Sequence, residues 1–249
     1  MNQFLLSILT IVCVFFFSSS LAAEQIVVGN FSETPQKGTF PDHWAPLVFE
    51  SVDKHTIYTH VVNEGVGSIQ ATSMAGSSGL ARKITIDPRH YSSLSFRWKI
   101  KDIIGAADLS HEKGDDAPAR VWVTFAYESG KVGWWEMMKF KGLKLLYSDY
   151  PPSACLVYVW ADNEKPGAII ENPNASRVKI IVLESGAEKK GQWVFEQRNI
   201  LEDYRAAFGS HDVPMISGVA VMTDTDDTGG EAVAWYGDII FSDLPQQSE

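Results

Sequence analysis

The chain has 249 residues and a formal net charge of −10, from 31 acidic against 21 basic residues. This balance predicts an acidic surface, which excludes nucleic acid and anionic membranes as favoured partners because both repel negative charge. Its two cysteines are too few for a disulfide-stapled fold, so stability must come from a hydrophobic core, with a bound metal as a second source.

Residues 1–23 carry no charged side chain, and most of residues 4–17 are apolar. Small residues follow at 18–23, so we expect a secretory signal peptide that is cleaved after Ala22 or Ala23. The apolar core is short for a membrane span of about 20 residues. The sequence therefore predicts a periplasmic or secreted protein with no transmembrane span after cleavage, and with residues 24–249 as a single domain.

Short segments of alternating polarity follow. Residues 94–100 are typical: Leu94, Phe96, Trp98 and Ile100 are expected to face a core, and the residues between them to face water. Comparable strands are expected at 57–62, 68–73, 80–86, 121–127, 156–160, 178–183, 192–198, 216–222 and 232–241. Many short strands joined by turns predict an all-β fold, a single β-sandwich or jelly roll. Galactose-binding-like and lectin-like domains are the fold-level analogy.

One helix is predicted over residues 200–208. Asn199 can cap its N-terminus, Glu202 has capping-box spacing, and Gly209 can end it. A second helical insertion is expected near 134–147, a segment rich in Trp and Met. Two interpretations stay open for it: a connector packed over the end of the sandwich, or a lid or partner-binding surface. Cys155, the cysteine left after cleavage, is expected to be a buried structural thiol.

Five motifs together carry a family resemblance, and they lie at 114–123, 156–160, 203–209, 224–229 and 235–239. The sequences are GDDAPARVWV, LVYVW, DYRAAFG, DTDDTG and WYGDI. Together they resemble a family of secreted bacterial proteins, the domain of unknown function 3047. The resemblance implies an exported bacterial protein with a β-sandwich fold. It implies no catalytic residue, because the family has no established activity.

An acidic turn lies between the predicted strands at 216–222 and 232–241. It places Asp224, Asp226 and Asp227 within four positions, followed by Gly229 and Gly230. Closely spaced carboxylates repel one another, and Asp and Thr oxygens around a glycine turn are suited to a hard cation such as Ca²⁺. Strands flank the turn, so it is not an EF-hand. The alternative is that the aspartates cap backbone amides of the turn.

Asp115 and Asp116 precede the strand that contains Val121. If this strand pairs antiparallel with residues 216–222, both acidic turns lie at one edge of the sheet. Five carboxylates would then form the metal site: Asp115, Asp116, Asp224, Asp226 and Asp227. Arg120 or Arg82 would supply the counter-charge, and both are candidate ligand-binding residues. Arg82 shares the parity of Leu80, and it either points inward to an acidic partner or reaches out to solvent.

Trp160, Asp162 and Asn163 are further candidate ligand-binding residues at the end of a predicted strand. Sugars stack on aromatic rings and bond to neighbouring carboxylates and amides. The alternative for Trp160 is a place in the core, where strand tryptophans commonly lie.

The favoured hypothesis is an exported, non-catalytic binding protein for a glycan or another envelope component, with Ca²⁺ as a structural aid. One alternative is a glycan hydrolase or lyase that uses the acidic cluster, which requires a carboxyl pair across a groove. Another is an envelope scaffold or assembly protein that acts through residues 134–147.

Overall fold

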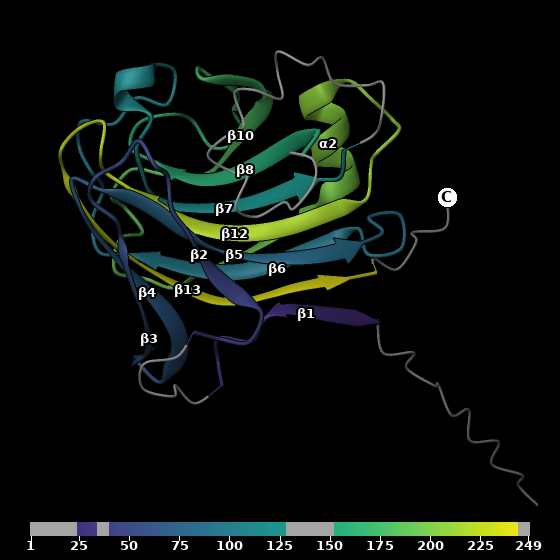
Figure 1. The fold of residues 1–249 in the computed structure, drawn as a ribbon, viewed down its shortest axis with the longest axis horizontal. Coiled ribbons are helices and arrows are strands. Elements are labelled where there is room, and N and C mark those ends of the chain that lie inside the picture. Colours follow the sequence, from purple (N-terminus) through teal and green to yellow (C-terminus); the bar gives the residue numbers. More distant parts are fainter. Residues whose placement is uncertain (1–23, 34–39, 128–151, 244–249) are drawn as a thin grey trace, which may run out of the picture.

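The computed structural model describes residues 24–33, 40–127 and 152–243. They form two β-sheets stacked face to face, which confirms the predicted β-sandwich (Figure 1). The predicted signal peptide and the segment expected to be helical near 134–147 lie outside the described residues. Among the described residues, no helix combines the length and apolar character needed to cross a membrane.

The first sheet has six strands, in the order β11-β6-β13-β4-β3 with β1 paired to β13. Their bounds are β1 (Gln25–Gly29), β3 (Ile57–Asn63), β4 (Val66–Met74), β6 (Ser93–Ile100), β11 (Val194–Asn199) and β13 (Glu231–Ser242). All of its pairings are antiparallel.

The second sheet has seven strands, in the order β2-β5-β12-β7-β8-β10-β9. Their bounds are β2 (Trp44–Leu47), β5 (Ser77–Ile86), β7 (Ala117–Phe125), β8 (Ala154–Ala161), β9 (Ile169–Asn172), β10 (Ala175–Ser185) and β12 (Ile216–Asp224). Only β8 and β10 pair in parallel among the described strands. This sheet carries both acidic turns.

Three of these strands, β1, β2 and β9, are absent from the sequence-based expectation. β2 contains Pro46, which argues against a strand by local rules but is tolerated here because β2 is an edge strand. β7 also begins earlier than expected and includes Pro118. The register between β7 and β12 is irregular beside Pro118, so its missing N–H breaks no regular ladder.

The core lies between the sheets and follows the predicted alternation. Leu94, Phe96, Trp98 and Ile100 are all buried, as expected for the inward face of β6. Trp98 meets Trp160 of the opposite sheet with ring centroids 6.1 Å apart. Large aromatic side chains from both sheets therefore fill the interior and fix the distance between the layers.

Helix α2 (Ile200–Phe208) confirms the predicted helix and its caps. The Asn199 side chain accepts hydrogen bonds from the amides of Leu201 and Glu202, and Gly209 ends the helix with φ at 66°. The helix lies at the end of the sandwich where β12 begins, whereas the acidic turn follows the other end of β12 (Figure 1). Helix and acidic turn are therefore at opposite ends of the molecule.

Cys155 is buried in β8, as predicted for a structural thiol. Burial raises the pKa of this thiol, so it stays protonated and unreactive at neutral pH.

Candidate functional site

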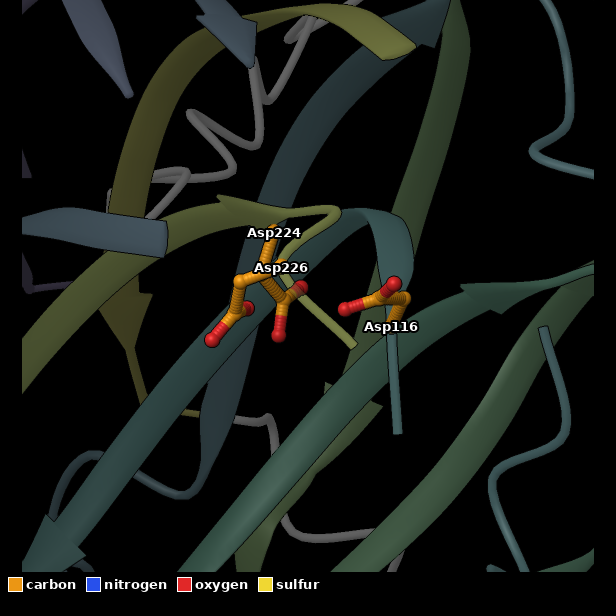
Figure 2. A group of neighbouring side chains, drawn as sticks. All are labelled: Asp116, Asp224 and Asp226. Atoms are coloured by element: carbon orange, nitrogen blue, oxygen red, sulfur yellow. The ribbon is translucent and has the colours of Figure 1, made fainter. Parts of the chain in front are cut away.

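The two acidic turns meet at one end of the seven-stranded sheet. β12 pairs antiparallel with β7, and Asp224 lies opposite Ala117, so Asp115 and Asp116 start one strand where Asp224 ends the other. Carboxylate oxygens of Asp116, Asp224 and Asp226 all lie within 4.8 Å of one another. Figure 2 places Asp224 and Asp226 side by side, with Asp116 facing them from the neighbouring chain segment. The predicted convergence is confirmed, and this cluster is able to hold a metal ion.

Arg120 supplies the counter-charge to this cluster. Its Nε donates to Asp224 at 2.9 Å, and its Nη2 donates to the side chain of Asp115 at 2.9 Å and to its carbonyl at 2.7 Å. The arginine is 1% exposed. A buried guanidinium and its two carboxylate partners stabilise the fold only when all three groups are present. Removing any one of them leaves a buried charge without its partner.

Asp116 has a structural task in the same cluster. Its two carboxylate oxygens accept hydrogen bonds from the amides of Asp227 at 3.3 Å and Thr228 at 2.7 Å. Amides of the acidic turn are therefore capped by Asp116 of the other turn, and not by the turn's own aspartates to which the capping interpretation referred. Asp226 and Asp227, by contrast, are exposed residues, and both line the neighbouring pocket.

Burial and mutual repulsion alter the acidity of the cluster. Burial raises the pKa of Asp224, against the opposing effect of Arg120. Partial burial, together with the neighbouring charges of Asp226, Asp116 and Asp115, raises the pKa of Asp227 to about 6. Partial burial also raises the pKa of Asp226. The negative charge of the cluster therefore exceeds the positive charge that Arg120 supplies.

A pocket of about 360 Å³ opens beside the cluster on the outer face of the seven-stranded sheet. Four aspartates, Asp115, Asp224, Asp226 and Asp227, contribute to its wall. Apolar lining comes from Leu47, Phe49, Val52, Trp122, Ala175, Val178 and Met222, and the remaining polar lining from Ser51, Ser77, Arg120, Asn172 and Asn174. The lining of the pocket is thus partly charged and partly apolar. We call this site the acidic pocket.

The pocket contains polar groups that have no partner in the protein. Arg120 Nη1 makes no hydrogen bond with the described part of the chain, although the other two guanidinium nitrogens do. The indole nitrogen of Trp122 is buried and also has no hydrogen-bond partner. Buried donors are normally paired, so the unpaired indole N–H of Trp122, with Arg120 Nη1 beside the same pocket, indicates a place for acceptor atoms of a ligand.

Sequence reasoning missed several residues of this pocket. Asn172 and Asn174 lie at the β9–β10 turn, and Asn172 reaches Asp115 with a hydrogen bond of 2.6 Å. Nothing local in the sequence places this turn beside β7. Trp122 gave a weak signal, because its strand was apolar on both faces and an outward tryptophan follows from that pattern.

Arg82 does not join the acidic cluster, which corrects the expectation that it would serve as a counter-charge there. It does share the inward parity of Leu80, but its Nη1 donates to the carbonyl of Val28 at 2.5 Å. It lines a different pocket, with Trp44 and His60. The strand register decides this outcome, because Arg82 lies five positions beyond Ser77, the residue of β5 opposite Asp224.

Trp160, Asp162 and Asn163 do not line the acidic pocket. Trp160 is 0% exposed and donates to the carbonyl of Gly186, so no ring face is open to a sugar and the stacking prediction is wrong. Asp162 is buried and accepts hydrogen bonds from the amides of Ile104 and Gly105, which fixes that loop. Asn163 is exposed beside it.

Several solved structures share a partial likeness with the chain. The K2 cleaved adhesin domain of Lys-gingipain is 11% identical, with a TM-score of 0.39 over 88% of this chain and 99% of that one. A family 12 xyloglucanase from Bacillus licheniformis is 7% identical, with a TM-score of 0.40 over 89% and 99%. The xyloglucanase domain of NopAA from Sinorhizobium fredii is 10% identical, with a TM-score of 0.37 over 82% and 100%.

No curated protein sequence matches the chain. A family model does match, over residues 42–240, and this range includes both acidic turns and the lining of the acidic pocket. The chain belongs to the family described as protein of unknown function DUF3047, which confirms the resemblance carried by its motifs.

Proposed function

We propose that this protein is an exported, non-catalytic binding protein that takes a glycan or another polyhydroxylated envelope component in the acidic pocket. The observation that carries the proposal is the combination of an apolar lining with unpaired donors and exposed carboxylates in a pocket of about 360 Å³. A pocket of this size falls within the usual range for small-molecule sites.

A sugar ring can contact both the apolar and the polar lining of the acidic pocket. Its C–H faces pack on apolar and aromatic side chains, here Trp122 and Phe49, while its hydroxyl groups both donate and accept hydrogen bonds. Hydroxyl oxygens can accept from Arg120 Nη1, and hydroxyl protons can be donated to Asp226 or Asp227. Unpaired donors and acceptors in one pocket favour a ligand that carries both.

The charge of the pocket narrows the ligand further. Four aspartates against a single arginine leave the lining negative, so acidic sugars are repelled and neutral or amino-bearing sugars are favoured. This preference distinguishes the proposed ligand from a nucleotide or an anionic polymer.

A divalent cation, Ca²⁺ by its preference for oxygen ligands, is proposed as a structural aid at Asp116, Asp224 and Asp226. The cation would offset the repulsion among these carboxylates and hold the turn that forms one wall of the pocket. Cation and glycan adjoin each other, because Arg120 is paired with the proposed metal ligand Asp224 and Asp226 belongs to both sites, so each is tested by its own measurement.

Glycan hydrolysis is less well supported than binding. Asp224 is bound to Arg120 and to the amide of Ala117, so this carboxylate is not free to act as base or nucleophile. Asp226 and Asp227 belong to the same turn, whereas a hydrolase needs carboxyl groups on two sides of the bond that it cleaves.

Binding to an oligosaccharide array tests the ligand. We expect binding to neutral or amino-bearing sugars that falls at least tenfold in Trp122→Ala, because part of the apolar lining is lost. Trp193→Ala is the matched control, since this tryptophan stacks on Arg97 at 5.6 Å and does not line the acidic pocket. Equal binding by wild type and Trp122→Ala would contradict the proposal, and release of reducing ends that Asp227→Asn abolishes would favour the hydrolase.

Thermal melting in Ca²⁺ and in excess chelator tests the cation. An ion at about 100 times its Kd stabilises the folded state by about 2.7 kcal/mol, so the melting temperature should rise by several degrees. Asp226→Asn should remove the rise, and Asp53→Asn, at an exposed loop position, should keep it. A melting temperature that does not respond to the chelator would remove the metal and leave the glycan proposal standing.

A further inference from the structure

A second pocket, of about 410 Å³, lies at the open edge between the two sheets. Its lining comes from β1 and β3 of one sheet and from β2 and β5 of the other, and from the segments beside them. Its lining includes Val28, Phe40, Asp42, Trp44, Glu33 and Arg82. None of them lines the acidic pocket. We call this second site the edge pocket.

Arg82 is the unusual residue of the edge pocket. It sits on the inward face of β5, and Nη1 donates to the carbonyls of Val28 at 2.5 Å and Val27 at 3.4 Å. Its Nε is enclosed and has no hydrogen-bond partner. Its Nη2 makes no hydrogen bond with the described residues, and no described carboxylate forms an ion pair with Arg82.

The free edge of this guanidinium has a specific geometry. Nε and Nη2 together present two parallel N–H groups, which is the arrangement that receives both oxygens of a carboxylate. Because Nη1 is held by two carbonyl groups, the guanidinium is fixed and this edge is pre-organised. Arg120, which is more deeply buried than the half-buried Arg82, uses the equivalent edge to bind carboxylates of the protein itself.

We propose that the edge pocket binds the carboxylate of a small organic acid with an apolar body, and that Arg82 is the anchor. The carboxylate pairs with Nε and Nη2 of Arg82. The apolar body lies against Phe40, which is 38% exposed, with Val28 and Trp44 as the deeper wall. The ligand is distinct from the proposed glycan, so the two sites can be tested separately.

The charges that line the edge pocket favour a carboxylate ligand over a phosphate ligand. The edge pocket offers one guanidinium, and its exposed lining includes the carboxylates of Glu33 and Asp42. A doubly charged phosphate is repelled by both more strongly than a singly charged carboxylate is. The same repulsion predicts that removal of the Asp42 charge tightens binding.

The test is a titration of the protein with benzoate, followed by NMR of the arginine Nε–H groups. An enclosed Nε–H exchanges slowly with water, so its resonance is observable, and Arg82→Lys assigns it. We expect the Arg82 resonance to shift in a saturable way with benzoate and not with benzamide, which has the same ring but no charge. Inorganic phosphate should bind at least tenfold more weakly than benzoate.

Variants give the second readout. Arg82→Lys keeps the charge but loses the paired N–H groups, so benzoate should bind at least tenfold more weakly, and Asp42→Asn should bind it two- to fivefold more tightly. If Arg82→Lys does not fold, the Arg82 resonance is assigned by sequential assignment of the wild-type protein. The benzoate titration then still tests the proposal. A benzoate titration that leaves the Arg82 resonance unmoved overturns the proposal. Equal binding of benzamide shows a merely apolar site, and preferred binding of phosphate overturns the assignment of a carboxylate.

Discussion

Arg120 shows at the scale of one residue how burial makes a charge dependent on its partners. Its guanidinium is 1% exposed and binds both Asp115 and Asp224, which come from the two different acidic turns. The ion pairs join the end of β12 to the start of β7. They stabilise the turn geometry only while all three side chains are present.

Arg120→Met should therefore lower the free energy of unfolding by about 3–5 kcal/mol, because two carboxylates lose their buried partner. Urea denaturation at neutral pH measures the change. Arg89→Met is the control: its ion pair with Asp87 is at the surface, with the arginine side chain 70% exposed, and should contribute far less to stability. Similar losses in the two variants would contradict the structural role assigned to Arg120.

Glu196 is expected to make the stability of the folded protein depend on pH. It accepts a hydrogen bond from the indole nitrogen of Trp98 at 3.2 Å, and burial, followed by the charge of Glu184, raises its pKa to about 7. Its pKa in the unfolded chain is about 4.3, so between these values the folded state binds more protons than the unfolded state. The stabilisation is complete below the unfolded pKa and is lost as pH rises through 7.

We expect the melting temperature of the wild type to fall between about pH 4.5 and pH 8, with Glu196 as one contributor. Glu196→Gln keeps the hydrogen-bond acceptor and cannot ionise, so its melting temperature should fall by less over this range. Differential scanning calorimetry at the two pH values compares the slopes. Parallel slopes would show that Glu196 has an ordinary pKa in the folded protein.

For helix α2, the N-cap and the apolar face that the sequence predicts agree with the contacts that the helix makes in the fold. The Asn199 oxygen accepts from the amides of Leu201 at 3.1 Å and Glu202 at 3.3 Å, while Ile200 and Tyr204 are buried against the core. Cap and apolar face were both readable from the sequence, which is why the helix was predicted with the correct bounds.

Asn199→Ala should lower the free energy of unfolding by about 0.5–2 kcal/mol, because two amides at the start of α2 lose their acceptor. Asn199→Asp supplies an equivalent oxygen and should stay close to the wild type. Urea denaturation of the three proteins provides the comparison. A loss in Asn199→Asp as large as that in Asn199→Ala would mean that the cap is not the cause.

The two sheets are joined, at the scale of the whole molecule, by polar contacts as well as by the apolar core. Tyr236 of β13 donates to the carbonyl of Met222 at 2.6 Å and lies 2.8 Å from the Thr223 hydroxyl, both on β12. The amide of Arg120 donates to the same tyrosine oxygen at 3.3 Å. This hydroxyl therefore connects the six-stranded sheet to the strands that carry the acidic turns.

Tyr236→Phe should cost about 1–3 kcal/mol, because the buried groups that surround the hydroxyl lose a partner with no water to replace it. The loss should appear in urea denaturation with an unchanged m-value, since the fold stays the same. Tyr91→Phe, at a partly exposed position, should change the free energy of unfolding by much less. An effect no larger than that of Tyr91→Phe would contradict the bridging role.

The class of fold is predicted from the sequence alone, and the sequence predicts that the two acidic turns meet if their strands are antiparallel neighbours, a pairing that the structure supplies. Period-two alternation at 94–100 identifies a strand and its inward face, and two turns on adjacent antiparallel strands must lie at one edge. It also determined the family, through motifs that the match over residues 42–240 confirms.

Tertiary packing determines which arginine pairs with the acidic cluster and which tryptophan lines the acidic pocket. Arg82 and Arg120 look alike in the sequence, as do Trp122 and Trp160, but one of each pair lines the acidic pocket. The physical reason is that strand register, and the loops that cover each sheet face, depend on packing between segments far apart in the chain. Local polarity patterns carry no information about these distant partners.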